Sequence, residues 1–341
     1  MDISRNEHIS RRRFTRDTVL LAGGALLGTS LKHSADAASA TDSFPRVKLG
    51  RTGELVTRMT LGTVPCAMPE GATPRQVADV IDEALNQGVR SVDVAPAYLR
   101  AEEGAGLALG ERRREVFLST KVAASTVEDA ERSLGNSLEL LKTDYVDVLY
   151  LHSVGSRPQD RDPDVALKPD GVFPWLLKQR RMGKCRFVGV SSHNAPSMCI
   201  PLLETGEVDV LLTVVNLVDR FTYNHEGVLL PIAKKHGTGV IAMKVFGGAK
   251  RVLPEGVPFN VAGPTELDRE HLATSLRYAL GVPGIAAVNL GCRTREEVRA
   301  NVAAVLGYQP LSDDEALAAE ALGRELAPKW AERFGPAERV A

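Results

Sequence analysis

Short apolar segments alternate with helical patterns along most of this 341-residue chain. Eight segments have the apolar, β-branched composition of strands: 59–63, 91–94, 115–121, 145–152, 187–191, 210–215, 240–245 and 286–290. Apolar residues three and four positions apart predict helices over 74–87, 103–112, 126–141, 172–182, 196–204, 227–236, 267–280 and 294–306. Strands that alternate with helices form a parallel sheet, and eight such units favour closure. The sequence therefore predicts an α/β protein, a (β/α)8 TIM barrel.

An open, doubly wound sheet is the alternative architecture for such a chain. Gly104, Gly106 and Gly110 resemble the glycine loop that binds dinucleotides in open sheets, but they do not follow a strand. Glu102 and Glu103 stand just before them and would repel a pyrophosphate. We interpret these glycines as positions of close helix packing, and the missing loop after the first strand weakens the open sheet.

Three further segments complete the predicted architecture. Residues 47–56 alternate around a glycine-rich turn and predict an N-terminal β-hairpin. The barrel domain is assigned to 44–312, and an amphipathic helix from Leu311 to Trp330 lies mostly in the extension 313–341, with Trp330 and Phe334 as expected anchors. The connections 153–171 and 250–264 are rich in Pro with Asp or Gly, and we expect them to be long loops over the active end of the barrel.

Residues 1–40 differ from the rest of the chain. The basic run Ser10–Arg16 precedes an apolar run over 19–31, and small residues follow that allow cleavage after Ala37 or Ala40. This order resembles a twin-arginine export signal. The alternative is a basic helix or a membrane anchor, but the apolar run contains glycines and is shorter than the about 20 residues that a spanning helix needs. We expect the twin-arginine machinery as a partner, a periplasmic or otherwise extracytoplasmic location, and no stable membrane insertion after cleavage.

Charge and cysteine content limit the other possible partners. The formal net charge of −1 gives no electrostatic reason to expect nucleic acid or an anionic membrane as a partner. The four cysteines are scattered, with no CxxC pair and no metal-ligand spacing, so we expect structural thiols and no metal site.

Three of the predicted strands end on titratable side chains. Asp93, Lys121 and His152 end successive strands at nearly equal spacing, and Tyr98 follows the first of them. Barrels of this class keep their chemistry at the carboxyl ends of their strands. The sequence therefore places these side chains together at one end of the barrel.

The same residues resemble a known family. Asp93-Val-Ala-x-x-Tyr98, then Glu102 and Gly106, then Thr120-Lys121, then Asp147 through His152 resembles the active-site pattern of the aldo-keto reductases. That family consists of NAD(P)H-dependent oxidoreductases on a TIM barrel, and the resemblance runs from about Val47 to Asn301. Leu99 departs from the pattern, because most members have glycine after the tyrosine.

The resemblance implies a role for each of the four residues. Hydride delivery to a carbonyl carbon leaves an alkoxide that needs a proton, and Tyr98 is the candidate acid. We expect Lys121 to stabilise the phenolate and ease proton loss, Asp93 to hold Lys121, and His152 to orient the carbonyl. A strand cap, a surface salt bridge and a satisfied histidine are the structural alternatives for Asp93, Lys121 and His152 taken singly.

The resemblance also implies a cofactor site for NADP, with NAD possible. Phosphate binding is expected after the last strands, where Thr294 and Glu297 predict a capping box and Arg293 and Arg295 supply positive charge. Leu212 replaces the glutamine that usually binds the nicotinamide amide, and Met243 replaces a stacking aromatic residue. The expected cofactor residues are Gly62, Thr63, Ser191, Ser192, Asn216, Met243, Lys244, Gly291, Arg293, Thr294, Glu297 and Asn301.

Two functions remain open. The first is an oxidoreductase that interconverts a small-molecule carbonyl compound (an aldehyde, ketone or sugar) and an alcohol, with Tyr98 as general acid and base. The second is a nicotinamide-binding sensor or partner subunit on the same fold without turnover. The four catalytic residue types favour the enzyme.

Overall fold

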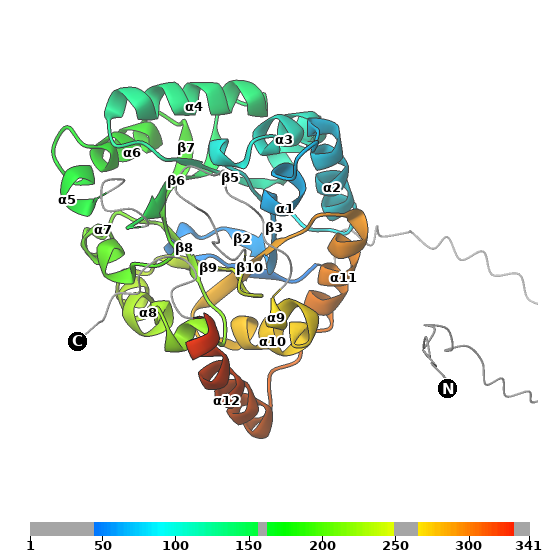
Figure 1. Cartoon of the computed structure of the whole chain (residues 1–341). Helices are drawn as coiled ribbons and strands as arrows, with labels where there is room; N and C mark the ends of the chain where they lie inside the picture. Colours follow the sequence, from blue (N-terminus) through cyan, green and yellow to red (C-terminus); the bar gives the residue numbers. More distant parts are fainter. Residues whose placement is uncertain (1–43, 156–161, 249–264, 331–341) are drawn as a thin grey trace, which may run out of the picture. The chain divides into compact units, whose positions relative to one another are not determined.

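Eight parallel strands close into a barrel in the computed structural model, which describes residues 44–155, 162–248 and 265–330 (Figure 1). The strand order around the barrel is β10-β3-β4-β5-β6-β7-β8-β9. Their bounds are β3 (Met59–Gly62), β4 (Ser91–Asp93), β5 (Phe117–Val122), β6 (Val146–Val154), β7 (Cys185–Ser192), β8 (Val210–Val214), β9 (Gly239–Met243) and β10 (Ile285–Gly291). The predicted closed barrel is confirmed, and the open sheet is wrong.

Helices follow the strands and surround the barrel (Figure 1). The longer ones are α2 (Pro74–Asn86), α3 (Ala101–Leu109), α4 (Val127–Leu141), α6 (Val172–Arg181), α7 (Ile200–Glu204), α8 (His225–His236), α10 (Leu272–Gly281) and α11 (Arg295–Leu306). Two predicted helices are interrupted: 196–204 begins as a 3-10 turn over Pro196–Cys199, and 267–280 divides into α9 (Glu266–Arg269) and α10. The second of these predicted helices follows residues 249–264, which lie outside the described residues. The loop expected over 250–264 therefore stays a prediction.

Two short helices were not predicted. They are α1 (Val64–Ala67) and α5 (Pro163–Ala166), and α5 lies within the connection expected to be a loop. Asp162 caps α5 by accepting a hydrogen bond from the Asp164 N–H at 2.9 Å, with Pro163 at the first helical position. An N-cap followed by proline is a helix-start signal that was present in the sequence.

The glycines of α3 have different roles. A Cβ atom on Gly104 would lie 2.5 Å from the Val77 Cβ, and one on Gly106 would lie 2.0 Å from the Leu140 carbonyl oxygen. Both glycines therefore let α3 pack closely on α2 and α4, as predicted. Gly110 contradicts the packing interpretation, because nothing lies within 4 Å of such an atom and its φ is +43°. Its role is the backbone conformation at the end of the helix.

Residues along each strand alternate between the barrel interior and the helix layer. Tyr150, Leu212, Ile241 and Met243 pack together in the interior, whereas Leu149, Leu211, Val240 and Leu290 belong to the core under the helices. Gly189 makes room for the Tyr150 ring, since a Cβ there would lie 2.3 Å from its Cδ1. The alternation places Asp93, Lys121 and Asn289 on the inward face.

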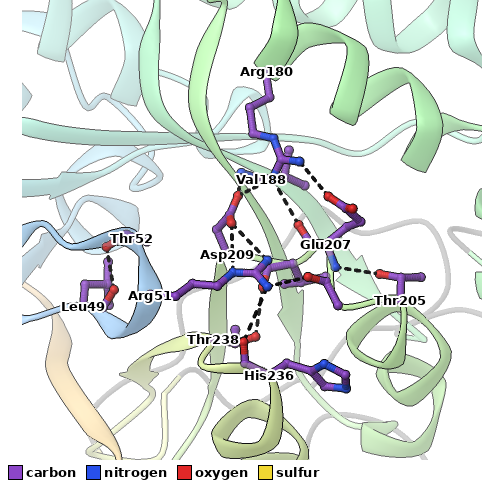
Figure 2. Close-up of polar contacts among 12 residues, drawn as sticks. Leu49, Arg51, Thr52, Arg180, Val188, Thr205, Glu207, Asp209, His236 and Thr238 are labelled. Atoms are coloured by element: carbon purple, nitrogen blue, oxygen red, sulfur yellow. Dashed lines mark hydrogen bonds and ion pairs between the residues drawn. The ribbon is translucent and has the colours of Figure 1, made fainter.

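The N-terminal hairpin lies across the amino end of the barrel. It consists of β1 (Arg46–Lys48) and β2 (Leu55–Thr57), which pair antiparallel, as predicted. Leu49 in its turn is fully buried with the interior cluster. Arg51 donates to Asp209 Oδ1 at 3.0 Å, and Arg180 donates to Asp209 Oδ2 at 2.8 Å (Figure 2). Asp209 therefore joins the hairpin to the start of β8, away from the predicted site.

The C-terminal helix α12 (Asp313–Trp330) packs on the carboxyl side of β8. Its Trp330 is buried with Leu217, Val218 and Leu326, and its indole N–H donates to Glu266 at 3.1 Å. The predicted anchoring by Trp330 is confirmed, whereas Phe334 lies outside the described residues. Within the described ranges, no helix is long and apolar enough to span a bilayer.

Candidate active site

The four predicted catalytic residues meet at the carboxyl end of the barrel. Asp93 ends β4, Lys121 lies near the end of β5, and His152 lies near the end of β6. Tyr98 closes a 3-10 turn over Pro96–Tyr98 that follows β4. The Lys121 ammonium lies 4.7 Å from the centre of the Tyr98 ring, and the Tyr98 and His152 ring centres are 5.9 Å apart in an edge-to-face arrangement. The fold thus brings together side chains 54 residues apart in sequence, from Tyr98 to His152.

Asp93 is held by three side chains. Its Oδ1 accepts hydrogen bonds from Lys121 Nζ at 2.7 Å and from Ser119 Oγ at 2.8 Å. Its Oδ2 accepts a hydrogen bond from the Asn289 amide at 3.0 Å. Asp93 and Lys121 are 3% and 1% exposed, and a buried ion pair needs such additional hydrogen bonds to offset desolvation. The expected pairing of Asp93 with Lys121 is present.

The sequence did not identify Ser119 or Asn289 as part of this network. Asn289 lies on β10, where it interrupts an apolar strand on the inward face. Gly62 makes room for it, because a Cβ atom there would lie 2.5 Å from the Asn289 Oδ1. A polar residue at an inward position of an apolar strand was the available signal. Gly62, expected to bind cofactor, therefore has a packing role in this network.

The surroundings of Tyr98 keep its phenol protonated, as a proton donor requires. Burial, and secondly the negative charge of Asp93, raise the pKa of the Tyr98 phenol well above its ordinary value. The Lys121 ammonium near the ring also donates to Asp93 and to the Val94 carbonyl oxygen at 2.8 Å. Burial also lowers the pKa of Lys121, against the opposing effect of Asp93. In this structure the phenol keeps its proton, and the expected stabilisation of the phenolate by Lys121 stays a prediction.

Three of the five described non-glycine residues with a positive φ lie beside these residues. Leu99, Ser153 and Lys244 have φ values of 49°, 55° and 56°, a region that non-glycine residues rarely adopt. Each directly follows a predicted site residue, namely Tyr98, His152 and Met243. Strain of this kind persists only where surrounding structure enforces it, and it clusters at functional sites. Leu99, the departure from the family pattern, is 63% exposed beside the catalytic phenol.

The expected cofactor residues of β7 and β9 lie at the same end of the barrel. Ser191 Oγ accepts a hydrogen bond from the Ser153 N–H at 2.8 Å and keeps its own proton for donation. Ser192 Oγ is buried with no hydrogen-bond partner among the described residues. Met243 is on the inward face in the interior cluster, to which Leu212 also belongs. Lys244 follows Met243 in the strained conformation described above.

Asn216 lies close to these residues, but its side chain is fully engaged. Its amide nitrogen donates to Asp219 Oδ2 and to the Lys244 carbonyl oxygen, and its amide oxygen accepts from the N–H groups of Val218 and Asp219. These four hydrogen bonds match the full capacity of an asparagine side chain. Asn216 shapes the turn after β8, and no polar atom of its side chain is left for a ligand.

The remaining expected residues meet where β3 adjoins β10 and α11 begins. Gly62 and Gly291 are register partners, and the Thr63 hydroxyl donates to the Asp93 carbonyl oxygen at 2.8 Å. Thr294 caps α11 by accepting from the Glu297 N–H at 3.3 Å. The Glu297 carboxylate accepts from the Arg293 N–H at 2.6 Å, so the predicted reciprocal bond to Thr294 is replaced by one to the preceding residue. The Asn301 amide is buried and donates to Cys292 Sγ at 3.3 Å.

The four cysteines are buried free thiols. Burial raises the pKa of Cys66 and of Cys292 to about 12 in each case, which keeps them protonated and unreactive. Within 44–155, 162–248 and 265–330, no cluster of His, Cys, Asp and Glu side chains could hold a metal ion.

Known proteins share this fold and sequence pattern. The Aldo/keto reductase family profile matches residues 58–252. The chain is 28% identical to the L-galactose dehydrogenase of Arabidopsis thaliana, over 78% of this chain and 90% of that protein. It is 26% identical to the pyridoxal 4-dehydrogenase of Microbacterium luteolum, over 74% and 91%. A solved aldo/keto reductase from Klebsiella pneumoniae, in complex with NADP and acetate, superimposes with a TM-score of 0.62 at 22% identity, covering 87% of this chain and 98% of that one.

The family profile covers more than half of the chain, and its span includes Asp93, Tyr98, Lys121 and His152. Interconversion of carbonyl compounds and alcohols is general to this family of oxidoreductases. The profile match, the closed barrel and the four residues at its carboxyl end together show that the chain belongs to the aldo/keto reductase family.

Proposed function

We propose that this protein is an NADP(H)-dependent oxidoreductase that interconverts a carbonyl compound and an alcohol, with Tyr98 as general acid and base. The observation that carries the proposal is the contact between the Tyr98 ring, the Lys121 ammonium and the His152 ring at the open end of the barrel. When bound, the cofactor supplies the hydride. The proton and the orientation of the substrate must come from the protein.

The site supports proton donation by Tyr98. The raised pKa keeps the phenol protonated near neutral pH, and an alkoxide is a far stronger base than a phenolate, so the transfer remains favourable. Proton loss leaves a negative charge on Tyr98 in a buried site, where the Lys121 ammonium is positioned to stabilise it. His152, at the edge of the Tyr98 ring, is placed to hydrogen-bond the same substrate oxygen and orient the carbonyl.

The residues present fit a nicotinamide dinucleotide in two places. At the barrel end, Ser191 retains a hydroxyl proton, Ser192 Oγ is a buried polar atom with no partner among the described residues, and Met243 offers a thioether that can pack on a ring. At the start of α11, the helix N-terminus and Arg293 favour a phosphate. Asn216 and Asn301 do not add to the fit, because their amides bind neighbouring groups. The NADP in the Klebsiella pneumoniae structure is consistent with this assignment.

Arg293 rather than Arg295 is the proposed reader of the 2′-phosphate. The Arg295 guanidinium forms an ion pair with Asp79, with 3.4 Å between Nη2 and Oδ1. The Arg293 side chain has no ion pair with the described residues. Arg293→Ala should weaken NADPH binding at least about tenfold and leave NADH binding nearly unchanged, because a charge-assisted phosphate contact is lost. Arg295→Ala is the matched control, and we expect a smaller loss. Titration of both dinucleotides into each variant measures this; equal losses of NADPH and NADH in Arg293→Ala would contradict the assignment.

Asn289 is a positioning residue that acts through Asp93. Asn289→Leu should lower kcat about tenfold, since a hydrogen bond to a charged group is lost. Asn289→Asp, which is closer in shape to asparagine, should lower kcat further at neutral pH, because two carboxylates would repel each other. Like charges raise the pKa of one of the two carboxyl groups. At lower pH that group is protonated and can donate a hydrogen bond to the other, so the turnover of Asn289→Asp should recover. A purely structural role predicts the reverse order and no such recovery in the pH profile.

A non-catalytic nicotinamide sensor is the second candidate on this fold. The two are separated by steady-state oxidation of NADPH with a panel of aldehydes, ketones and sugars. Sugars are included in the panel because the chain is similar to an L-galactose dehydrogenase. The enzyme is expected to consume NADPH with at least one of these substrate classes. Binding of NADPH without consumption across the panel would favour the sensor.

We also propose that residues 1–40 are a twin-arginine signal and that the mature protein is periplasmic or extracytoplasmic. The support is the sequence alone, since this segment lies outside the described residues. Replacing Arg11, Arg12 and Arg13 by lysine keeps the positive charge and removes the arginine pair. Fractionation of cells should then find the protein in the cytoplasm, whereas the unchanged chain is exported. Equal distribution of both chains would overturn this proposal.

A further inference from the structure

A second imidazole lies beside His152. His193 directly follows β7, and its ring centre is 6.1 Å from that of His152, at an interplanar angle of 56°. The ring centre of Tyr98 is 5.9 Å from that of His152. His152 therefore has the phenol and a second histidine as ring neighbours at the mouth of the barrel. The proposed reaction assigns no role to His193.

His193 is a side chain available to a ligand. It is half-buried, and it forms no hydrogen bond or ion pair with residues 44–155, 162–248 or 265–330. Other polar side chains at this end of the barrel differ in this respect, because Asp93, Lys121 and Asn216 are held by hydrogen bonds. His225, by comparison, is a fully buried histidine whose two ring nitrogens are out of reach of solvent.

The environment of His193 keeps its imidazole neutral. Burial, followed by the positive charge of Lys244 and the nearby His152, His225 and Lys121, lowers its pKa well below the ordinary value. A neutral imidazole has one N–H donor and one acceptor nitrogen. Such a group suits an uncharged hydroxyl, which can donate and accept. A carboxylate or an ionised phosphate would use only the N–H donor and would leave the acceptor nitrogen unpaired.

The separation of the two histidines fits a pair of neighbouring oxygens. Hydrogen bonds from ring nitrogens to oxygen are about 2.9 Å long, so rings 6.1 Å apart can each reach one of two oxygens on adjacent carbons. His152 and Tyr98 would contact the reacting oxygen. His193 would then face the oxygen on the next carbon.

We propose that His193 binds a hydroxyl group on the carbon next to the reacting carbonyl, which makes the substrate an α-hydroxy carbonyl compound or, in the oxidative direction, a vicinal diol. Open-chain reducing sugars belong to this class. The inference rests on the proposed function, because His152 must orient the carbonyl for His193 to meet its neighbour. A substrate without the hydroxyl would leave the imidazole unpaired in a partly buried site, and sites of this kind discriminate against the analogue that lacks the group.

Matched pairs of aldehydes test this inference. Glycolaldehyde with acetaldehyde, and lactaldehyde with propionaldehyde, differ within each pair only in the hydroxyl group next to the carbonyl. The unchanged protein should show a kcat/KM at least about tenfold higher for the hydroxylated member, since one tenfold step corresponds to about 1.4 kcal/mol, a typical hydrogen-bond contribution. His193→Leu should reduce this ratio to near one, mainly through KM, and His193→Asn should retain part of it.

Two comparisons keep the result interpretable. The hydration of each aldehyde in water is the same for every variant, so it cancels when ratios are compared between variants. His236→Leu removes an imidazole that binds Glu204 on the outer surface, and it should leave the ratio unchanged. The inference is overturned if the unchanged protein shows no preference, or if His193→Leu lowers both members of a pair equally. No turnover of any aldehyde, ketone or sugar of the panel would overturn the proposed function, and the inference with it.

Discussion

Replacing Tyr98 by phenylalanine should lower kcat for carbonyl reduction by at least about 100-fold, the lower range of general acid catalysis. The substitution removes the phenol proton and keeps the ring, so the contacts of that ring with Lys121 and His152 remain. Cofactor affinity should change little. Steady-state kinetics with saturating NADPH measure the effect. Tyr145→Phe, the same chemical change beside Arg113 at the amino end of the barrel, is the control and should retain turnover.

The raised pKa of Tyr98 also predicts how turnover depends on pH. A phenol whose pKa lies above its ordinary value of about 10 stays protonated through neutral and mildly alkaline pH. Loss of this proton should therefore not limit reduction in that range. Oxidation of the alcohol needs the phenolate as base, so its rate should increase as pH rises. Near-full activity of Tyr98→Phe would exclude Tyr98 as the proton donor.

Replacing Lys121 by methionine should lower both stability and turnover. The change removes the cation from a pair in which both side chains are buried, and breaking such a pair costs about 3 kcal/mol or more because the remaining charge is uncompensated. Ser119 and Asn289 still donate to Asp93, so we expect the lower end of that range. Denaturant unfolding of the variant measures the loss.

The effect of Lys121→Met on rate has a separate cause. The ammonium lies 4.7 Å from the Tyr98 ring centre, and opposite charges at about 4 Å interact by about 4 kcal/mol in a partly shielded protein environment. Loss of this stabilisation of the phenolate should lower kcat at least about 100-fold. Lys235→Met removes an exposed lysine that pairs with Glu204 and should change neither property. A variant at position 121 as stable and active as the parent would contradict both arguments.

The barrel was predictable because its signal is local and repeated. Each strand needs only a few consecutive β-branched or apolar residues, and each helix needs its own apolar periodicity, as in 74–87 and 126–141. In the structure, Thr73 caps the first of these helices by accepting a hydrogen bond from the Gln76 N–H. The break between α9 and α10 was missed, because apolar spacing continues across it in the sequence.

The site was predictable only in part. Asp93, Lys121 and His152 each end a strand, and parallel strands bring such ends together. Asn289 is 196 residues from Asp93, so their hydrogen bond depends on closure of the barrel between β10 and β3. The raised pKa of Tyr98 was missed for a related reason: burial and the nearby charge of Asp93 are properties of the assembled site. Asn216 resembled a ligand residue, but its hydrogen bonds are to residues near it in the folded chain.

The most direct test of the proposed reductase is transfer of a labelled hydride. The protein would be mixed with NADPH that carries two deuterium atoms at the transferring carbon of the nicotinamide ring and with a carbonyl substrate that the panel identifies. Mass spectrometry of the alcohol product should find a single deuterium on the former carbonyl carbon, and Tyr98→Phe should form that product at least about 100-fold more slowly. NADPH that binds and stays intact, or an alcohol without the label, would contradict the account.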